Sequence, residues 1–422
     1  MANDETTRFH RQVAETLAQL YRHEERAPEG WREAQAWHWE QAGAYAAATD
    51  TALVIAELRV TRLDFAGARQ WAERALALIE RLPVEEQHTY ELRAYTLALS
   101  VLEFGGQYRE GYEYARRMLR AAQRHSNREA EIRAVLAIGR MQRELGQLTA
   151  AEQTLAQARI EAERDEFGEL ETDARLHLAK VHQLQGRHLE ALQELQLARE
   201  ENEQIDDKLK LARVLTNIGD IYRVLGSSRE ASGFYTRALV FEQGRGSLIG
   251  QAILREKLAL VLLDQNKPSE ALTSAEEGLR IRERLHDVVG QARSYTVIGT
   301  ILSRLGRHSQ AMSNYERARD LQELTQNPRG QSIALVHLGD ALRALRQPQQ
   351  ASDAFNQALT LARRDNDQIG MARALERLGD LAEEQGQPEM ARGRWNEALR
   401  IRETLKHVDE AVKLRNRMQQ RI

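Results

Sequence analysis

Two short segments of this 422-residue chain contain residue types that could bind a nucleotide or a calcium ion. Gly244–Gly250 resembles a dinucleotide-binding glycine loop, but it has one residue too many and no strand is predicted before it. Residues 365–370 together with Glu376 imitate a calcium loop, yet Ile369 stands at a ligand position. The last glycine of each segment belongs to one column with a spacing of 40 residues, which comprises Gly250, Gly290, Gly330 and Gly370. We therefore interpret both segments as turns between structural units.

Histidines could also form a catalytic or metal-binding group. His177 and His337 occupy equivalent positions of the repeat described below, but Asn217, Lys257 and Val297 between them are not a set of metal ligands. The absence of cysteine excludes disulfides, thiolate metal sites and cysteine nucleophiles. Neither His-Glu-x-x-His nor the phosphate-binding Gly-x-x-x-x-Gly-Lys-Ser/Thr occurs, and no convergent nucleophile, base and stabiliser is visible. We predict no cofactor, no metal and no enzymatic activity.

Small residues recur along the chain at intervals of 40 residues, which is typical of a solenoid. One column comprises Ala151, Ala191, Ala231, Ala271, Ala311, Ala351 and Ala391. A second comprises Gly139, Ala179, Gly219, Ala259, Gly299, Gly339 and Gly379 inside a predicted helix, where glycine costs about 1 kcal/mol relative to alanine. This repeated cost predicts closely packed helices.

A third column lies where each apolar helical pattern stops. It comprises Gly106, Gly146, Gly186, Gly226, Asn266, Gly306, Arg346 and Gly386, and we place Asp64 in the same turn of the first unit. Glycine and asparagine tolerate the left-handed conformation that ends a helix. Each unit is therefore predicted to be a helix A, a short turn and a helix B.

The residue pattern of the unit resembles that of the tetratricopeptide repeat (TPR), of a long type with 40 rather than the usual 34 residues. Residues 215–226, followed by Ala231, Tyr235 and Ala238, carry the spacing of the TPR signature. The aromatic position recurs as Tyr315, Phe355 and Trp395, whereas Leu155, Leu195 and Ala275 replace it elsewhere. The resemblance implies an all-α, right-handed TPR superhelix of antiparallel helix pairs. We expect about nine units over residues 51–405, an N-terminal helical cap over 1–50 and a C-terminal capping helix over 406–422.

In TPR folds helix A lines a concave groove, and the register assigns the lining residues here. The lining comprises Arg133, Leu136, Arg140, Arg143, Asp173, Leu176, Lys180, Gln183, Arg213, Thr216, Asp220, Arg223, Arg293, Thr296, Thr300, Ser303, Ile333, Val336, Asp340, Arg343, Arg373, Glu376, Asp380 and Glu383. Positive charge gathers at Arg133, Arg140, Arg143 and Lys180, and negative charge gathers at Asp340, Glu376, Asp380 and Glu383. Arginine suits carboxylates and phosphates, so we expect an acidic peptide or anionic ligand in the N-terminal half of the groove. A solvated charged groove without a ligand is the alternative. The predicted binding residues are Arg133, Arg140, Arg143, Lys180, Gln183, Arg213, Asn217, Asp220, Arg223, Asp340 and Arg343.

The N-terminal segments Phe9–Leu17 and Ala36–Gly43 precede the first clear repeat. They resemble the entry to the TPR sensor of STAND-class signalling NTPases, which include MalT-like and other LuxR-type regulators. The resemblance implies a sensor region cut from a larger NTPase, although the sequence shows no NTPase core and its last residues look like a capping helix, after which we expect no LuxR-type DNA-binding domain. Trp31, Trp37 and Trp39 could instead simply bury the open end of the first repeat.

Composition limits the partners. The formal net charge is −3, so counterion release gives no general affinity for nucleic acid. The sequence has no apolar run of membrane-spanning length and no signal peptide, and we expect a cytoplasmic protein without membrane contact. We predict a non-enzymatic module that binds a protein, a peptide or a small-molecule signal, as the sensor or interaction region of a bacterial signalling protein. A stand-alone scaffolding adaptor is the alternative, since Asn217 preserves one helix-A asparagine of long-repeat TPR adaptors, and an enzyme at the groove mouth is a third hypothesis.

Overall fold

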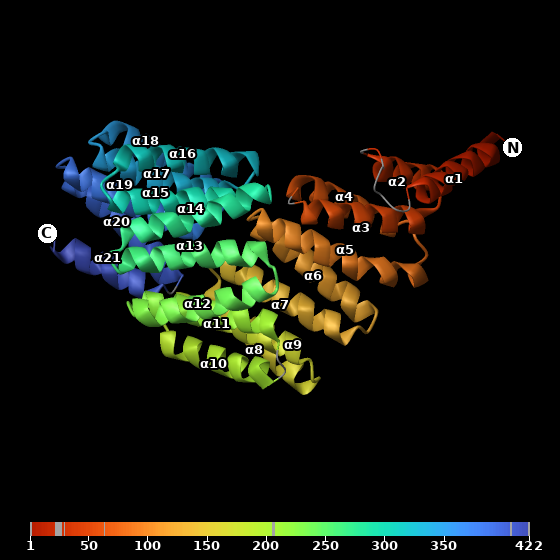
Figure 1. Cartoon of the computed structure of the whole chain (residues 1–422), viewed down its shortest axis with the longest axis horizontal. Helices are drawn as coiled ribbons and strands as arrows, with labels where there is room; N and C mark the ends of the chain where they lie inside the picture. The colour runs from red at the N-terminus through yellow and green to blue at the C-terminus, as the bar shows by residue number, and fades with distance from the viewer. Residues whose placement is uncertain are drawn as a thin grey trace. The chain divides into compact units, whose positions relative to one another are not determined.

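The computed structural model describes residues 2–21, 28, 30–62, 64–204, 207–405 and 407–420. Within these ranges the chain forms α-helices joined by short connections, with no strand (Figure 1). The helices are α1 (Ala2–Leu20), α2 (Trp31–Gln41), α3 (Tyr45–Thr61), α4 (Phe65–Ile79), α5 (Val84–Phe104), α6 (Tyr108–Arg124), α7 (Arg128–Glu144), α8 (Leu148–Arg164), α9 (Gly168–Leu184), α10 (His188–Gln204), α11 (Lys208–Val224), α12 (Ser228–Gly244), α13 (Leu248–Asp264), α14 (Pro268–Arg284), α15 (Val288–Arg304), α16 (His308–Leu324), α17 (Pro328–Ala344), α18 (Pro348–Arg364), α19 (Gln368–Glu384), α20 (Pro388–Thr404) and α21 (Val408–Gln420). The prediction of an all-α solenoid is confirmed.

The chain divides into two compact units, Met1–Ile138 and Gly139–Ile422, called unit 1 and unit 2 below. Unit 1 contains α1 to α6 and most of α7, and unit 2 contains the end of α7 and α8 to α21. In both units, helices that follow one another in the sequence pack against one another as antiparallel neighbours. No helix in the described part of the chain is long and apolar enough to cross a membrane.

The 40-residue period has a simple local origin. From α7 to α20 each helix has 17 residues, and three residues connect it to the next helix. At the end of helix A the backbone turns through a left-handed residue, with φ of 72° at Gly106, 77° at Gly146 and 80° at Gly226. Asn266 and Arg346 adopt the same conformation, with φ of 60° and 59°. The structure thus places this predicted column at the turns between helices. Asp64 differs, because it has a negative φ and its side chain caps α4 by accepting a hydrogen bond from the Gly67 N–H, 3.0 Å away.

The glycines inside helix A make room for the large residue of helix B. A methyl group added to Gly219 or Gly299 would lie 2.6 Å from Cε1 of Tyr235 or Tyr315, respectively. The same relation joins Gly339 to Phe355, Gly379 to Trp395 and Gly139 to Leu155. Where the small column has alanine, the partner column has an aliphatic side chain, in the pairs Ala179 and Leu195 and Ala259 and Ala275, whereas each aromatic partner faces a glycine. The two columns are therefore complementary in size, which explains why a helix interior repeatedly accepts glycine.

This complementarity can be tested at Gly339, which lies under the ring of Phe355. Gly339→Ala is expected to lower the free energy of unfolding by about 1–2 kcal/mol, because overpacking outweighs the gain in helix propensity. In the double variant Gly339→Ala/Phe355→Leu the loss should be smaller than the sum of the two single losses, since it recreates the natural pair Ala179 and Leu195. Urea unfolding followed by circular dichroism measures all three variants, and strictly additive losses would contradict the pairing.

The second glycine column lies within the first turn of helix A rather than in the turn between units. Gly250, Gly290 and Gly330 are the third residues of α13, α15 and α17. Their N–H groups donate to the side chains that cap these helices, with Ser247 at 3.2 Å, Asp287 at 2.8 Å and Asn327 at 2.9 Å. Each glycine also lies against a polar side chain of the preceding helix, which is Glu242, Arg282 or Gln322. The segment 244–250 is thus a helix connection and a capped helix start.

One of these polar side chains, Arg282, has only 2% of its surface exposed. Its guanidinium donates to Glu256 Oε1 at 2.8 Å, to Glu256 Oε2 at 3.2 Å and to Asp287 Oδ2 at 2.6 Å. The Ser294 hydroxyl donates to the same Glu256 carboxylate. Burial alone would lower the pKa of Arg282, but Glu256 and Asp287 raise it above its ordinary value. This group of charges ties α14 to α13 and to the start of α15.

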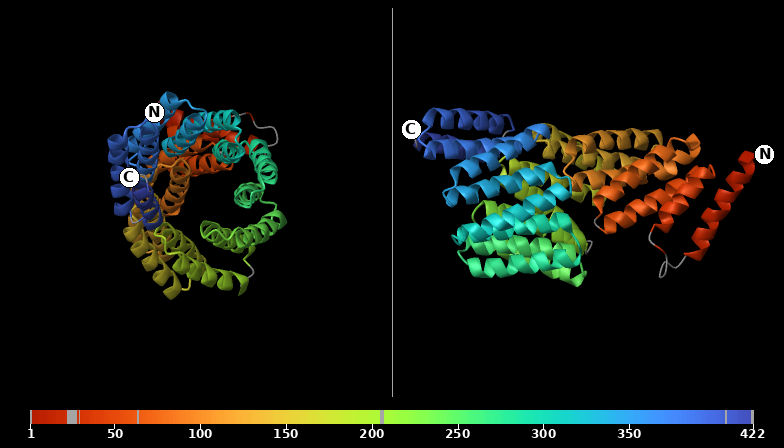
Figure 2. Two further views of the ribbon diagram at one scale, coloured as in Figure 1. Left: turned by 90° about the vertical axis from the view of Figure 1, so that its left-hand side faces the viewer. Right: turned by 90° about the horizontal axis from the view of Figure 1, so that it is seen from above.

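The first and last parts of unit 2 are in contact. The Arg329 Nη1 atom at the start of α17 lies 2.8 Å from Glu144 Oε2 at the end of α7. A methyl group added to Gly146 would lie 2.6 Å from Leu405 Cδ2, just after α20. Figure 2 (left) shows the helices of unit 2 following one another around a closed path. Unit 2 therefore completes one superhelical turn, which brings residues far apart in the sequence together inside it.

The terminal helices pack as further members of the stack. Trp39 packs against the apolar cluster of α3 and α4, whereas Trp37 is 51% exposed and Trp31 contacts Tyr21, with ring centroids 5.4 Å apart. The three tryptophans therefore do not all cover the apolar end of the first repeat, as Trp37 is mostly exposed. At the other end, Leu414 of α21 lies in the core cluster that includes Trp395. Met1, Lys406, Arg421 and Ile422 of the predicted terminal segments lie outside the described residues.

Candidate ligand-binding groove

The groove lining predicted from the sequence is only partly open to solvent. Leu136, Leu176 and Val336 are buried in the helix packing, so these columns contain core residues rather than groove residues. Asp380 is buried as well, with 6% exposed. The predicted binding residues are partly buried, apart from Arg213, which is exposed. Most of them contact other charged or polar side chains. These contacts determine whether each residue is available to bind a ligand.

At the start of unit 2, Arg143 lies between a carboxylate and a histidine. Its guanidinium donates to Glu144 Oε1 at 2.7 Å, and its Nη1 lies 3.2 Å from His177 Nδ1. Because a guanidinium only donates, His177 Nδ1 must accept, which leaves the imidazole neutral with its proton on Nε2. Burial, followed by Arg143, Arg140 and Arg213, lowers the pKa of His177 well below its usual value. His177 was not among the predicted binding residues, although its register position beside Lys180 is visible in the sequence.

Lys180 lies on α9, less than one turn after His177. Its ammonium donates to Gln183 Oε1 at 2.8 Å, and within the described ranges no carboxylate lies at ion-pair distance from it. Burial lowers the pKa of Lys180; Lys257 and Arg143 lower it further, against an opposing effect of Asp220. Lys180 is thus a partly buried cation near Arg143. Its hydrogen-bond partner is the neutral amide of Gln183.

Asp220 belongs to a bridge between repeats. Its carboxylate accepts from Lys257 Nζ at 2.6 and 2.8 Å and from the Tyr235 hydroxyl at 2.6 Å. Burial alone would raise the pKa of Asp220, but Lys257 and Lys180 hold it below its usual value. The Asp220 carboxylate is therefore already paired with side chains of the protein itself. Lys257, which supplies them, was missed because it stands outside the predicted columns.

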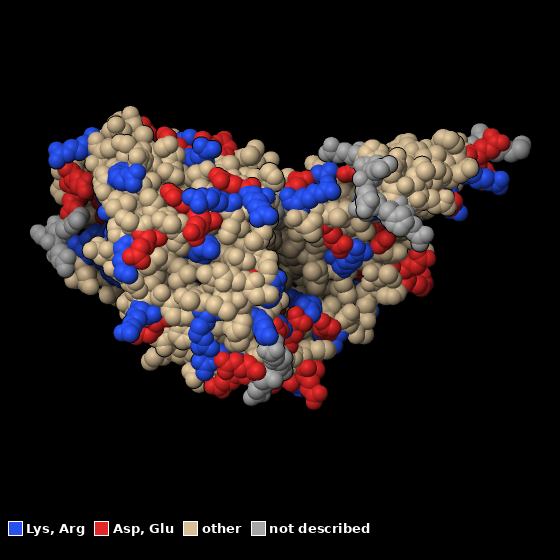
Figure 3. Space-filling view, viewed as in Figure 1, with Lys and Arg blue, Asp and Glu red and all other residues tan. Residues whose placement is uncertain are grey.

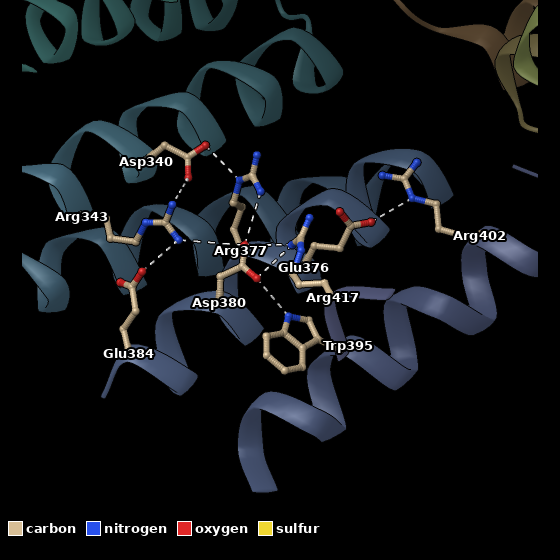
Figure 4. A network of polar contacts seen from close by, with 9 residues as sticks. All are labelled: Asp340, Arg343, Glu376, Arg377, Asp380, Glu384, Trp395, Arg402 and Arg417. Carbon is tan, nitrogen blue, oxygen red and sulfur yellow. Dashed lines mark hydrogen bonds and ion pairs between the residues drawn. The ribbon is translucent and has the colours of Figure 1, made fainter. Parts of the chain in front are cut away.

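The same bridge recurs twice near the C-terminal end (Figure 4). Arg377 Nε lies 2.9 Å from Asp340 Oδ2, and Arg417 Nη1 lies 3.0 Å from Asp380 Oδ1. In all three bridges the cation follows the aspartate by 37 residues. Trp395 Nε1 donates to Asp380 at 3.2 Å, as Tyr235 does to Asp220. The bridge is thus a repeated way to join one helix A to the next.

These contacts correct the predicted acidic patch. Arg343 lies within ion-pair distance of Asp340, Asp380 and Glu384, at 3.7, 4.0 and 3.6 Å (Figure 4). Arg402 Nε lies 3.0 Å from Glu376 Oε1. Asp340, Glu376 and Asp380 are therefore neutralised by arginines, several of which come from positions outside the predicted columns. On the face drawn in Figure 3, acidic and basic side chains are likewise interspersed.

The remaining predicted residues have internal partners. Arg133 lies in unit 1, pairs with Glu129 at 2.7 Å and lines a cavity of about 410 Å³ there. Arg213 pairs with Asp173 at 2.9 Å and Arg223 with Asp264 at 3.6 Å. Asn217 Nδ2 donates to the Arg213 carbonyl at 2.9 Å. The structure thus groups Arg143 and Lys180 with His177, and places Arg140 among the charges that act on His177. No group of three or more His, Cys, Asp or Glu side chains in the described ranges is arranged to hold a metal ion.

Paired helices stacked in register, with left-handed turns and size-matched columns, define an α-solenoid. The chain belongs to the tetratricopeptide repeat family, because the pattern of that repeat matches residues 171–239, 250–323 and 330–404, which make up just over half of the chain. This match confirms the resemblance seen in the sequence. The tetratricopeptide fold is typically an interaction scaffold without catalytic function. Comparison with curated protein sequences gave no match.

One solved structure shows the same fold, and two others are less similar. A Rap protein complexed with competence and sporulation factor has a TM-score of 0.52 and 15% identity, over 80% of this chain and 98% of that chain. BtubC from P. vanneervenii has a TM-score of 0.43 and 21% identity, over 52% and 91% of the two chains. A STAND protein with a TPR sensor from Pyrococcus horikoshii has a TM-score of 0.49 and 16% identity, over 78% and 52%. At these identities the similarity shows the fold alone.

Proposed function

We propose that the groove of unit 2 binds an acidic peptide segment through Arg143, Lys180 and their neighbours on α7 and α9. The observation that carries this proposal is the environment of Lys180, a confined cation whose hydrogen-bond partner is the neutral Gln183. A carboxylate placed there would supply the missing negative charge in surroundings of reduced dielectric constant, where charge pairing is strong. His177, on the same helix, is neutral and adds no charge to those of Arg143 and Lys180.

The proposed biological role is that of a sensor or interaction region in a bacterial signalling protein. The Rap protein of similar fold was solved in complex with competence and sporulation factor, so this architecture can hold a regulatory ligand. The adaptor alternative depended on Asn217, but its amide is bonded to the backbone of its own helix. We therefore favour the sensor role. A cytoplasmic location fits this role.

Fluorescence anisotropy with a labelled decapeptide of glutamate tests the proposal. Lys180→Glu/Arg143→Glu should weaken binding by about 10- to 100-fold, or about 1.4–2.8 kcal/mol, because two attractive charges become repulsive. The matched control is Lys413→Glu on α21, an exposed lysine, which should bind within about twofold of the parent. Equal affinity of the double variant and the parent would contradict the site.

A parent chain that binds no acidic peptide would contradict the proposed ligand class. Affinity capture from the source-cell lysate, followed by mass spectrometry, would then identify the partner. If no protein is captured, thermal-shift screening of metabolites distinguishes a small-molecule signal from a peptide.

A further inference from the structure

A second confined cation lies on the other side of the superhelical turn. Arg373 is in the second turn of α19, in the same register column as Arg213 and Arg293, and it is partly buried. Arg213 has an ion pair with Asp173. Within the described ranges, by contrast, no side chain or carbonyl lies within hydrogen-bond or ion-pair distance of the Arg373 guanidinium. All five N–H donors of Arg373 therefore lack a protein acceptor.

Two further arginines are held close to Arg373 by residues on either side of it. Arg402 from α20 is bonded to Glu376, one turn after Arg373, at 3.0 Å. Arg329 from α17 lies 3.9 Å from Asp367, the residue just before α19. Burial lowers the pKa of Arg373, and the nearby Arg402 and Arg329 lower it further, against an opposing effect of Asp367 and Glu376. Three guanidinium groups thus share this part of the groove.

The carboxylates of the region are already engaged. Glu376 accepts from Arg402, and Glu144 accepts from both Arg143 and Arg329. The imidazole of His407 cannot supply a negative charge, and its Nδ1 lies 3.3 Å from Arg402 Nη1.

A partly buried guanidinium without an acceptor is costly for a scaffold. Burial removes part of its hydration, and neighbouring cations add repulsion that Asp367 and Glu376 offset only in part. Arg377 on the same helix differs from Arg373, because its guanidinium donates a hydrogen bond to Asp340. The arrangement is that of a binding site whose negative partner comes from outside the chain.

We propose that Arg373, with Arg402 and Arg329, forms a binding site for an oxyanion, namely a carboxylate or phosphoryl group. The planar fork of Arg373 can donate two parallel hydrogen bonds to such a group, and the neighbouring arginines stabilise its charge. This site lies on α17, α19 and α20. Arg329 shares the Glu144 carboxylate with Arg143, but the proposal rests on Arg373 and does not depend on the function proposed above.

Thermal unfolding in sodium chloride, sodium acetate and sodium phosphate at one pH and one ionic strength tests the site. The parent should unfold about 2–4 °C higher in acetate or phosphate than in chloride, and the more effective salt distinguishes a carboxylate from a phosphoryl ligand. Arg373→Met should remove this shift and should also raise the unfolding temperature in chloride, because an unpaired charge is replaced by an apolar side chain of similar length. Arg373→Lys should keep part of the shift.

The matched control is Arg293→Met, the exposed residue of the same column, which should keep the full salt response. Lys180→Glu should keep it too, which separates this site from the proposed peptide site. An Arg373→Met variant that unfolds at a lower temperature, or that retains the oxyanion shift, would overturn the proposal. A parent without any shift would overturn it as well.

Discussion

Replacing Arg282 by Met is expected to lower the free energy of unfolding by about 3–5 kcal/mol. The guanidinium is fully enclosed between Glu256 and Asp287, so its removal leaves two buried carboxylates without their cation. The loss should therefore exceed that of any exposed arginine. Urea unfolding at neutral pH, followed by circular dichroism, measures it.

The matched control for this variant is Arg280→Met, which removes an exposed arginine from the same helix. It should change the free energy of unfolding by about 0.5 kcal/mol or less. Adding Glu256→Gln and Asp287→Asn to Arg282→Met should restore part of the stability, because the uncompensated charges are then gone. A loss below about 1 kcal/mol for Arg282→Met would show that water reaches this group.

Acidification is expected to destabilise unit 2 through His337. Burial, together with Arg373 and Arg377, lowers the pKa of His337 to about 4, and its ring stacks on Tyr315 with centroids 5.3 Å apart. The unfolded chain therefore binds more protons than the folded chain between about pH 6.5 and pH 4. The neutral histidine contributes full stability above pH 6.5, and up to about 3 kcal/mol is lost as the pH falls to 4.

His337→Phe isolates this contribution, since phenylalanine retains a ring on Tyr315 but cannot be protonated. The free energy of unfolding of the parent should fall more steeply than that of the variant between pH 6.5 and pH 4. His177, His182 and His407 also have lowered pKa values, so both proteins lose some stability. Parallel curves for parent and variant would show that His337 has the same pKa in the folded and the unfolded chain.

The sequence predicted the repeat well because its columns arise from local geometry. A left-handed turn favours glycine or asparagine, and Gly146 and Asn266 show this at equivalent positions. A helix interior that repeatedly accepts glycine signals a close neighbour, although the ring of Tyr235 as that neighbour became visible only in the structure. The 37-residue spacing of the bridges, such as Asp220 to Lys257, is also present in the sequence and could have identified them.

The site was predicted less completely, because charge patterns along one helix face do not show which charges are paired. Asp340 and Asp380 look like an acidic patch in the sequence, but Arg377 and Arg417 neutralise them from the following repeat. The contact of Arg329 with Glu144 joins residues 185 positions apart, and no local pattern announces it. Such contacts depend on how far the superhelix turns per repeat, which is the sum of many small rotations.

The contact between the ends of unit 2 has an evolutionary consequence. An open array of repeats can gain or lose a member by duplication or deletion, because each repeat touches only its neighbours. Here, one inserted or deleted repeat between α8 and α17 would carry Arg329 away from Glu144 and Leu405 away from Gly146. We therefore expect the number of repeats in this unit to stay constant among relatives, while substitutions accumulate within the repeats.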